Sequence, residues 1–145
     1  MPLANFGAIL NFARELEEQD RDFYSALSRR PEFEDVRGLL DDFTAGAATH
    51  IKDIDRTRRE NVTEMILEPI RDFSRDAFCL DSPDPGSLAL SDFFREAGKR
   101  ESRARDFCLA AAEKLKSLSE VSRAFARLAA KRERKLNCLQ ETGGL

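Results

Sequence analysis

The sequence predicts an all-α protein: an antiparallel bundle of four helices, in which two helical hairpins are joined by a long connection. One observation is that four segments carry apolar side chains at steps of three and four, the period of an amphipathic helix. The other is an internal repeat, because Arg21–Ala26 (RDFYSA) returns as Arg105–Ala110 (RDFCLA). An Ala and a Glu stand at matching positions upstream of each copy. Such self-similarity is typical of duplicated structural units, here two related helix pairs.

The first two helices are expected at Asn5–Arg29 and Glu32–Asn61, with Pro31 as the stop between them. Their short connection predicts antiparallel neighbours. The apolar stripe of the first includes Phe6, Ile9, Leu10, Ala13, Leu16, Phe23, Tyr24 and Leu27; that of the second includes Phe33, Val36, Leu40, Phe43, Ala47, Ile51 and Ile54.

The third helix is expected to begin near Ser87, a favourable N-cap, and to run to about Leu115. The fourth is expected at Ser119–Gln140, with Gly143 and Gly144 in a frayed tail. Their inward stripes include Leu90, Phe94, Ala97, Ala104, Cys108 and Ala111 in the third helix and Val121, Phe125, Leu128 and Leu139 in the fourth.

The segment Val62–Gly86 joins the two hairpins. Pro69 interrupts it, Asp81–Gly86 has the composition of a loop, and Ile70–Leu80 has room for a short helix. A connection of this length suits a crossover that travels along the bundle rather than a tight turn.

Composition narrows the function classes. A chain of 145 residues predicts one domain, 1–145, around one core. The net charge is −3 with acids and bases mixed, so no nucleic-acid partner is expected. Apolar runs are too short to span a bilayer, so no membrane partner is expected either. The first residues lack the pattern of a secretory signal, which favours a cytoplasmic protein.

Cys79, Cys108 and Cys138 are odd in number and widely separated. No pair has the spacing of a metal knuckle or a redox motif. We therefore interpret them as ordinary reduced thiols, with Cys108 acting as a small apolar residue on a helix face. Their role is otherwise open.

The informative observation is a set of polar residues on the four inner stripes. The first three helices contribute Glu17, His50 and Glu101, and the fourth contributes Arg132 and Lys135. All five lie near the middle of their helices, so one layer of the core can contain them. Because isolated buried charges cost several kcal/mol, they must be paired, or the layer must admit water or a metal ion.

These residues resemble the rubrerythrin-type branch of the ferritin-like superfamily. There, helices one and three each carry a Glu two turns before an aromatic residue, as Glu17 precedes Phe23-Tyr24 and Glu101 precedes Phe107-Cys108. Helices two and four each carry Leu-Ala-x-x-Glu-x-x-His. Phe43–His50 fits this pattern with Ala47 in place of Glu, and Leu128–Lys135 fits it with Arg132 and Lys135 in place of Glu and His.

The resemblance implies a ferritin-like four-helix bundle that once held two metal ions. Glu17, His50 and Glu101 are the remnant ligands. Arg132 and Lys135 offset the charge of Glu17 and Glu101, which predicts salt bridges in place of metals and no cofactor. The expectation is a structural or interaction protein that has lost catalysis.

Two alternatives stay open. Glu17, His50 and Glu101 could bind one iron, manganese or zinc ion, with Asp20 or Asp53 one turn away. The protein would then be a non-haem metal oxidoreductase or peroxidase acting on peroxide or dioxygen. Alternatively, Arg132 or Lys135 could grip a small anion in the polar layer.

The eleven Phe residues suggest a partner. Phe33, Phe73, Phe78 and Phe93 exceed what one small bundle is expected to bury, and exposed aromatics mark self-association faces. Members of the resembled family commonly dimerise. We therefore expect a homodimer and leave any other protein partner unidentified.

Overall fold

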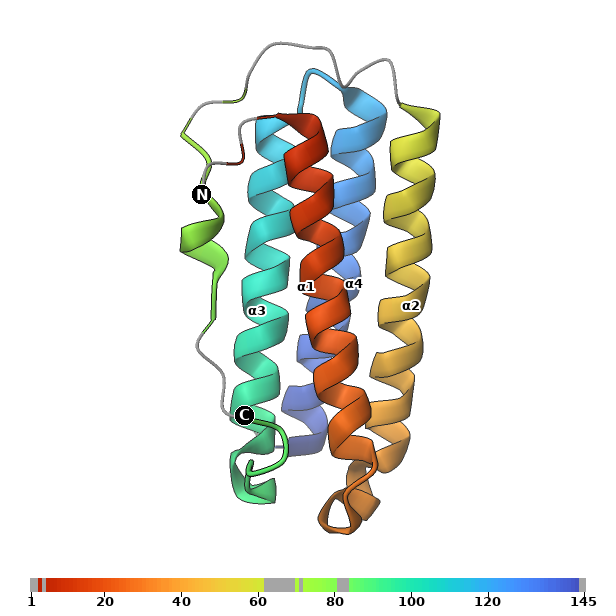
Figure 1. The fold of residues 1–145 in the computed structure, drawn as a ribbon, viewed down its shortest axis with the longest axis vertical. Helices are drawn as coiled ribbons and strands as arrows, with labels where there is room; N and C mark the ends of the chain where they lie inside the picture. The colour runs from red at the N-terminus through yellow and green to blue at the C-terminus, as the bar shows by residue number, and fades with distance from the viewer. Residues whose placement is uncertain (1–2, 4, 62–69, 71, 81–83, 144–145) are drawn as a thin grey trace.

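The computed structural model describes residues 3, 5–61, 70, 72–80 and 84–143. Four long helices lie side by side along one axis (Figure 1). They are α1 (Phe6–Ser28), α2 (Arg37–Glu60), α3 (Leu90–Lys114) and α4 (Ser119–Gly143), with 3₁₀ turns η1 (Pro31–Val36) and η3 (Arg75–Phe78). The all-α, four-helix prediction is thereby confirmed. Within the described ranges, no helix has both the length and the apolar character needed to cross a membrane.

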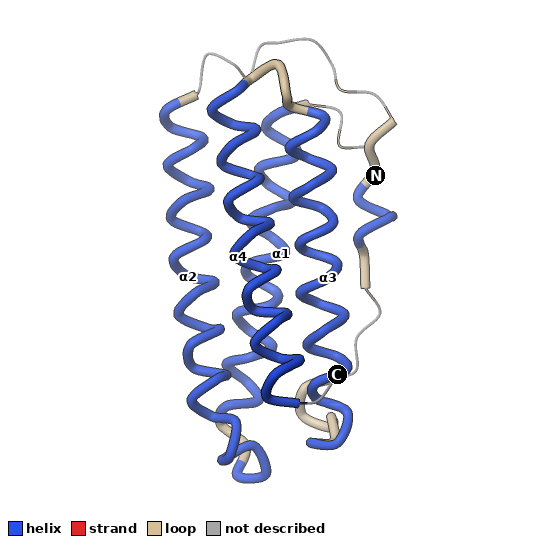
Figure 2. The backbone as a smooth tube through the Cα atoms, turned by 180° about the vertical axis from the view of Figure 1, so that it is seen from behind, coloured by secondary structure: helices blue, strands red, loops and turns tan. Residues whose placement is uncertain are grey.

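The helices form two antiparallel pairs. α1 packs chiefly on α2, and α3 chiefly on α4, while weaker contacts join α1 to α3 and α2 to α4. α2 and α3 run in the same direction, so the chain between them has to return along the bundle, and η3 lies beside α3 on that path (Figure 1, Figure 2). The predicted crossover is therefore present in the arrangement of the described elements.

Local chemistry explains where the first helices begin. The side chain of Asn5 accepts a hydrogen bond from Ala8 N at 2.8 Å and caps α1. The expected start of the second helix at Glu32 was wrong, because Pro31–Val36 forms a 3₁₀ turn and α2 begins at Arg37. Phe33 has φ −102° and ψ 15° inside that turn, which is outside the α-helical region.

The third helix also begins later than expected, at Leu90. Ser87 lies in a turn, where its N–H and its hydroxyl both donate to Asp84 O. The fourth helix extends through Gly143, beyond the predicted end at Gln140. Gly144 lies outside the described residues.

The crossover is only partly described. Among the described residues of 70–80, only Arg75–Phe78 is helical, with Ser74 Oγ accepting from Asp76 N at 3.2 Å. Residues 62–69, which include Pro69, and residues 71 and 81–83 lie outside the described residues.

Two apolar clusters fill the bundle, one toward each end. The first joins the start of α1 to the end of α3 and the start of α4; the second joins the end of α1 to the starts of α2 and α3. Most buried acids and His50 fall between these clusters along the helices. The core thus has apolar ends and an ionic middle.

The expectation that four Phe residues are left over for self-association was wrong. Phe33 and Phe93 are fully buried and meet edge to face, with ring centroids 5.8 Å apart. Phe73 is buried and stacks on Phe107 at 5.8 Å, and Phe78, half-buried, meets the same ring. The crossover therefore covers Phe107 of α3 and adds apolar surface that the four helices alone lack.

Candidate functional site

The polar residues singled out on the inner stripes do meet in the core. Glu17, His50, Glu101 and Arg132 are each no more than 3% exposed, and the Lys135 side chain is 12% exposed. They come from all four helices, at the middle of the bundle. We call this set, together with Asp20, the ionic layer.

Arg132 occupies the centre of the ionic layer. Its Nη1 donates to Glu101 Oε2 and lies 3.0 Å from Asp20 Oδ2, while its Nη2 lies 2.8 Å from Glu17 Oε1. The contact with Glu17 is a close ion pair without hydrogen-bond alignment. One guanidinium from α4 therefore faces three carboxylates from α1 and α3.

His50 ties α2 to the ionic layer. Its Nδ1 lies 3.0 Å from Glu17 Oε1, the same oxygen that Arg132 approaches. Glu17 Oε2 is buried and has no hydrogen-bond partner among the described residues. His50 and Arg132 therefore converge on one oxygen of this carboxylate.

Lys135 sits at the edge of the ionic layer. Its Nζ lies 3.8 Å from Glu101 Oε1 and 5.1 Å from the centre of the Phe43 ring. A Cβ placed on Gly46 would stand 3.2 Å from this Nζ, so the glycine of α2 makes room for the lysine. Burial lowers the pKa of Lys135, against the opposing charge of Glu101.

Two buried arginines that sequence reasoning missed complete the ion network. Arg100 Nη1 and Arg103 Nη2 donate to Asp20 Oδ1 at 3.1 and 2.7 Å. They lie beside the predicted inward stripe of Ala97, Glu101 and Ala104. Because only that stripe was expected to face the core, both arginines were expected on the outer face of the helix. The signal that could have found them is the series Phe93, Ala97, Arg100, Ala104 and Phe107, which also steps by three and four.

The electrostatics favour an ionised Glu17. Burial opposes its ionisation, but the Arg132 charge and the His50 hydrogen bond outweigh burial and lower the pKa of Glu17 to about 2. Burial likewise opposes the charge of Arg132, yet the three carboxylates raise its pKa well above the ordinary value. The central pair is therefore charged throughout the physiological range.

The pKa of Glu101, which is also fully buried, shifts in the opposite direction. Burial raises the pKa of Glu101, against Arg132 and Lys135, and the neighbouring acids Asp20 and Glu17 add to the increase. Glu17 and Glu101, which occupy matching positions of the sequence repeat, thus have opposite pKa shifts. The difference comes from their neighbours, since only Glu17 receives a hydrogen bond from His50.

Tyr24 and Cys108 lie beside this layer at matching positions of the repeat. Burial raises the pKa of both, that of Cys108 to about 12. Tyr24 Oη has no hydrogen-bond partner within the described ranges. Neither side chain carries a charge at neutral pH, so neither balances the ionic layer.

In the part of the chain that the structure describes, no three His, Cys, Asp or Glu side chains are grouped so that they could hold a metal ion. Asp53, a suggested extra ligand, instead pairs with Lys131 at 3.0 Å and Arg56 at 3.2 Å. Asp20, the other suggestion, points its oxygens at arginines.

Comparison of the chain with protein-family models, with curated proteins and with solved structures found no match.

Proposed function

We propose that this chain is a rubrerythrin-type, ferritin-like bundle in which a buried guanidinium replaces the metal ions, and that it serves as a structural or interaction protein without redox catalysis. The contact of Arg132 with Glu17, Asp20 and Glu101 is the observation that carries the proposal. In the resembled family, positions 47, 132 and 135 would supply metal ligands. Here Ala47 supplies none, and Arg132 and Lys135 supply positive charge.

Charge explains why this set of residues suits an arginine better than a metal pair. Three carboxylates face Arg132 and Lys135, with Arg103 also on Asp20. A divalent cation placed among them would stand against like charges that cannot dissociate. A guanidinium can also donate directed N–H hydrogen bonds to several carboxylates at once.

A second candidate function has its own observation. Glu17 Oε2 and Glu101 Oε1 are both buried without a hydrogen-bond partner in the described ranges, although Lys135 lies 3.8 Å from the latter. Carboxylate oxygens of this kind can bind a metal ion. Together with His50, they would be the remaining metal ligands of a non-haem oxidoreductase acting on peroxide or dioxygen. This candidate requires Arg132 to leave the centre.

Metal analysis separates the two candidates. We would purify the protein without chelator, measure iron, manganese and zinc by mass spectrometry, and repeat the measurement after adding each ion. The proposal predicts far less than one ion per chain. Near-stoichiometric metal that disappears in Glu17→Gln but persists in Glu18→Gln, a half-exposed neighbour outside the ionic layer, would overturn it.

The homodimer remains a prediction from the resemblance. Its original support, exposed phenylalanines, is gone, because Phe33, Phe73 and Phe93 are buried. Sedimentation equilibrium on the whole chain measures the association state directly. A binding role for an anion at Arg132 is less favoured, because the three carboxylates already use this guanidinium.

A further inference from the structure

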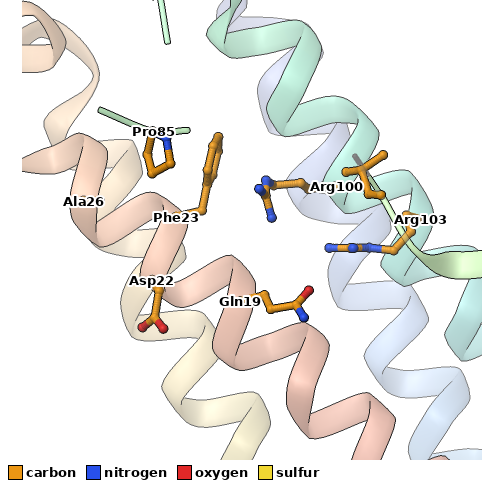
Figure 3. Close-up of a pocket in the computed structure, with 8 residues that line it drawn as sticks. Gln19, Asp22, Phe23, Ala26, Pro85, Arg100 and Arg103 are labelled. Carbon is orange, nitrogen blue, oxygen red and sulfur yellow. The ribbon is translucent and has the colours of Figure 1, made fainter. Parts of the chain in front are cut away.

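A groove opens between α1 and α3, on the outer side of the Asp20 cluster. Its volume is about 490 Å³, within the range of small-molecule sites. Figure 3 shows Arg100, Arg103 and Gln19 reaching into the space between the two helices. The groove is lined by Gln19, Asp22, Phe23, Ala26, Leu80, Pro85, Arg100 and Arg103.

The two arginines in this groove are held in place by the core. They are only 7% and 8% exposed, and both donate to one oxygen of Asp20. The Arg100 guanidinium also lies over the Phe23 ring, 3.8 Å from its centre. Because these contacts restrain both side chains, little conformational entropy remains to be lost when a ligand binds.

Arg103 keeps donor capacity beyond Asp20. Its Nη2 is directed to that carboxylate, but its Nε is buried with no hydrogen-bond partner in the described part of the chain. Asp20 is shared, since Arg100 and Arg132 contact it as well. Burial lowers the pKa of Arg103, the charges of Arg100 and Arg132 act in the same direction, and Asp20 opposes them.

The other walls define what kind of anion fits. Phe23, Ala26, Leu80 and Pro85 are apolar, and Gln19 adds one amide. Asp22, the acid on the rim, pairs with Arg21 at 3.2 Å, is largely exposed and points away from the two arginines in Figure 3. An apolar groove with buried guanidiniums at its base is suited to a molecule with one anionic end and an apolar body.

We propose that this groove binds a small carboxylate with an apolar or aromatic body, the carboxylate meeting Arg103 and Gln19 and the body lying against Ala26 and Pro85. A carboxylate accepts charge-assisted hydrogen bonds from guanidinium N–H groups. The proposal is independent of whether the ionic layer holds a metal. Its site lies on the opposite side of Asp20 from Arg132 and needs neither His50 nor Glu101.

Calorimetry and NMR titration of the whole chain with three probes test the proposal. Benzoate carries the expected chemistry, benzyl alcohol keeps the ring without the charge, and inorganic phosphate keeps a charge without the ring. We expect benzoate to bind with Kd on the order of 1 mM or tighter and the other two to bind at least about tenfold more weakly. Equal binding of phosphate, equal binding of benzyl alcohol, or no binding of benzoate would each overturn it.

Variants locate the site. Arg103→Gln should weaken benzoate at least about tenfold, whereas Arg95→Gln, an exposed arginine of the same helix, should leave it unchanged. Because loss of Arg103 also disturbs Asp20, a second variant leaves the ions intact. Ala26→Leu should fill the groove and abolish binding while circular dichroism stays native. Benzoate affinity that survives Ala26→Leu would contradict the assignment.

Discussion

Glu17 Oε1 of α1 lies 2.8 Å from Arg132 Nη2 of α4, and both side chains are almost completely buried. The same guanidinium reaches Asp20 of α1 and Glu101 of α3, and His50 of α2 meets the same oxygen of Glu17. All four helices are therefore joined in one cluster, in which Arg132 connects α1, α3 and α4 and Glu17 connects these to His50 of α2. This centre has direct consequences for stability, because removing one partner leaves the others as buried, uncompensated charges.

Arg132→Ala should lower the free energy of unfolding by about 3 to 5 kcal/mol, because it removes the cation that three buried carboxylates share. Arg134→Ala, an exposed arginine on the same helix, should change it by less than about 0.5 kcal/mol. Urea unfolding followed by circular dichroism measures both. Similar losses in the two variants would mean that the central contacts contribute little.

Asp20→Asn should also destabilise the fold by about 3 kcal/mol or more, since Arg100, Arg103 and Arg132 all contact this carboxylate. Asp22→Asn is the matched control: it changes the same atoms two residues away, at a side chain 72% exposed. The difference in urea midpoint between the two variants measures the effect of losing a buried charge, apart from the chemical change itself. If Asp22→Asn proves as damaging as Asp20→Asn, the cluster is not the cause.

Acid should destabilise the protein through Glu17. Its pKa falls from 4.5 in the unfolded chain to about 2 in the fold, so the folded state binds fewer protons between those values. The free energy of unfolding therefore rises with pH across that window, by about 3 kcal/mol from this group, and the gain is lost as pH falls toward 2.

Glu17→Gln should flatten the pH dependence of the urea midpoint between pH 2 and 4.5, and Glu18→Gln should retain it. Glu101 acts in the opposite direction. Because its pKa is raised, the fold binds more protons than the unfolded chain above pH 4.5, and its contribution decreases as pH rises through the folded pKa. A slope unchanged in Glu17→Gln would refute the role given to Glu17.

Gly46 and Lys135 should be energetically coupled. Gly to Ala inside a helix normally stabilises by about 1 kcal/mol, but here the new Cβ would stand 3.2 Å from Lys135 Nζ. In a Lys135→Ala background, Gly46→Ala should give that full gain; in the native background, it should give less. A double-mutant cycle by thermal unfolding measures the difference, and simple additivity would show that the two side chains do not compete for space.

The thiols should react in the order of their exposure. Cys79 is exposed, whereas Cys108 is buried with a pKa raised by burial to about 12. Brief treatment of the native protein with iodoacetamide should alkylate Cys79 first and leave Cys108 unmodified. Peptide mass spectrometry identifies the modified residue, and the same treatment in urea should modify Cys108 as well. Rapid labelling of native Cys108 would indicate an open core at that position.

Local pattern accounts for the parts of the fold that sequence reasoning predicted well. The period of three and four that places Glu17, His50, Glu101 and Arg132 on inward stripes depends only on helix geometry, and all four are buried. Helix starts were less predictable. Ser87 is a residue type favoured at N-caps, but its N–H and hydroxyl donate to Asp84 O in the preceding turn. The helix begins three residues later, at Leu90.

Read alone, the sequence determined the number of helices, most of their inward faces and the presence of opposite charges in the middle of the core. Leu90, expected on the inward stripe of the third helix, is instead exposed at the start of α3. Only the tertiary structure decided which acid meets which base: that Arg132 serves three carboxylates, that Arg100 and Arg103 share Asp20, and that Phe73 covers Phe107. The physical reason is that a helix face follows from neighbours three and four residues apart. Ion partners, by contrast, depend on the register between helices, which the packing of the whole chain sets.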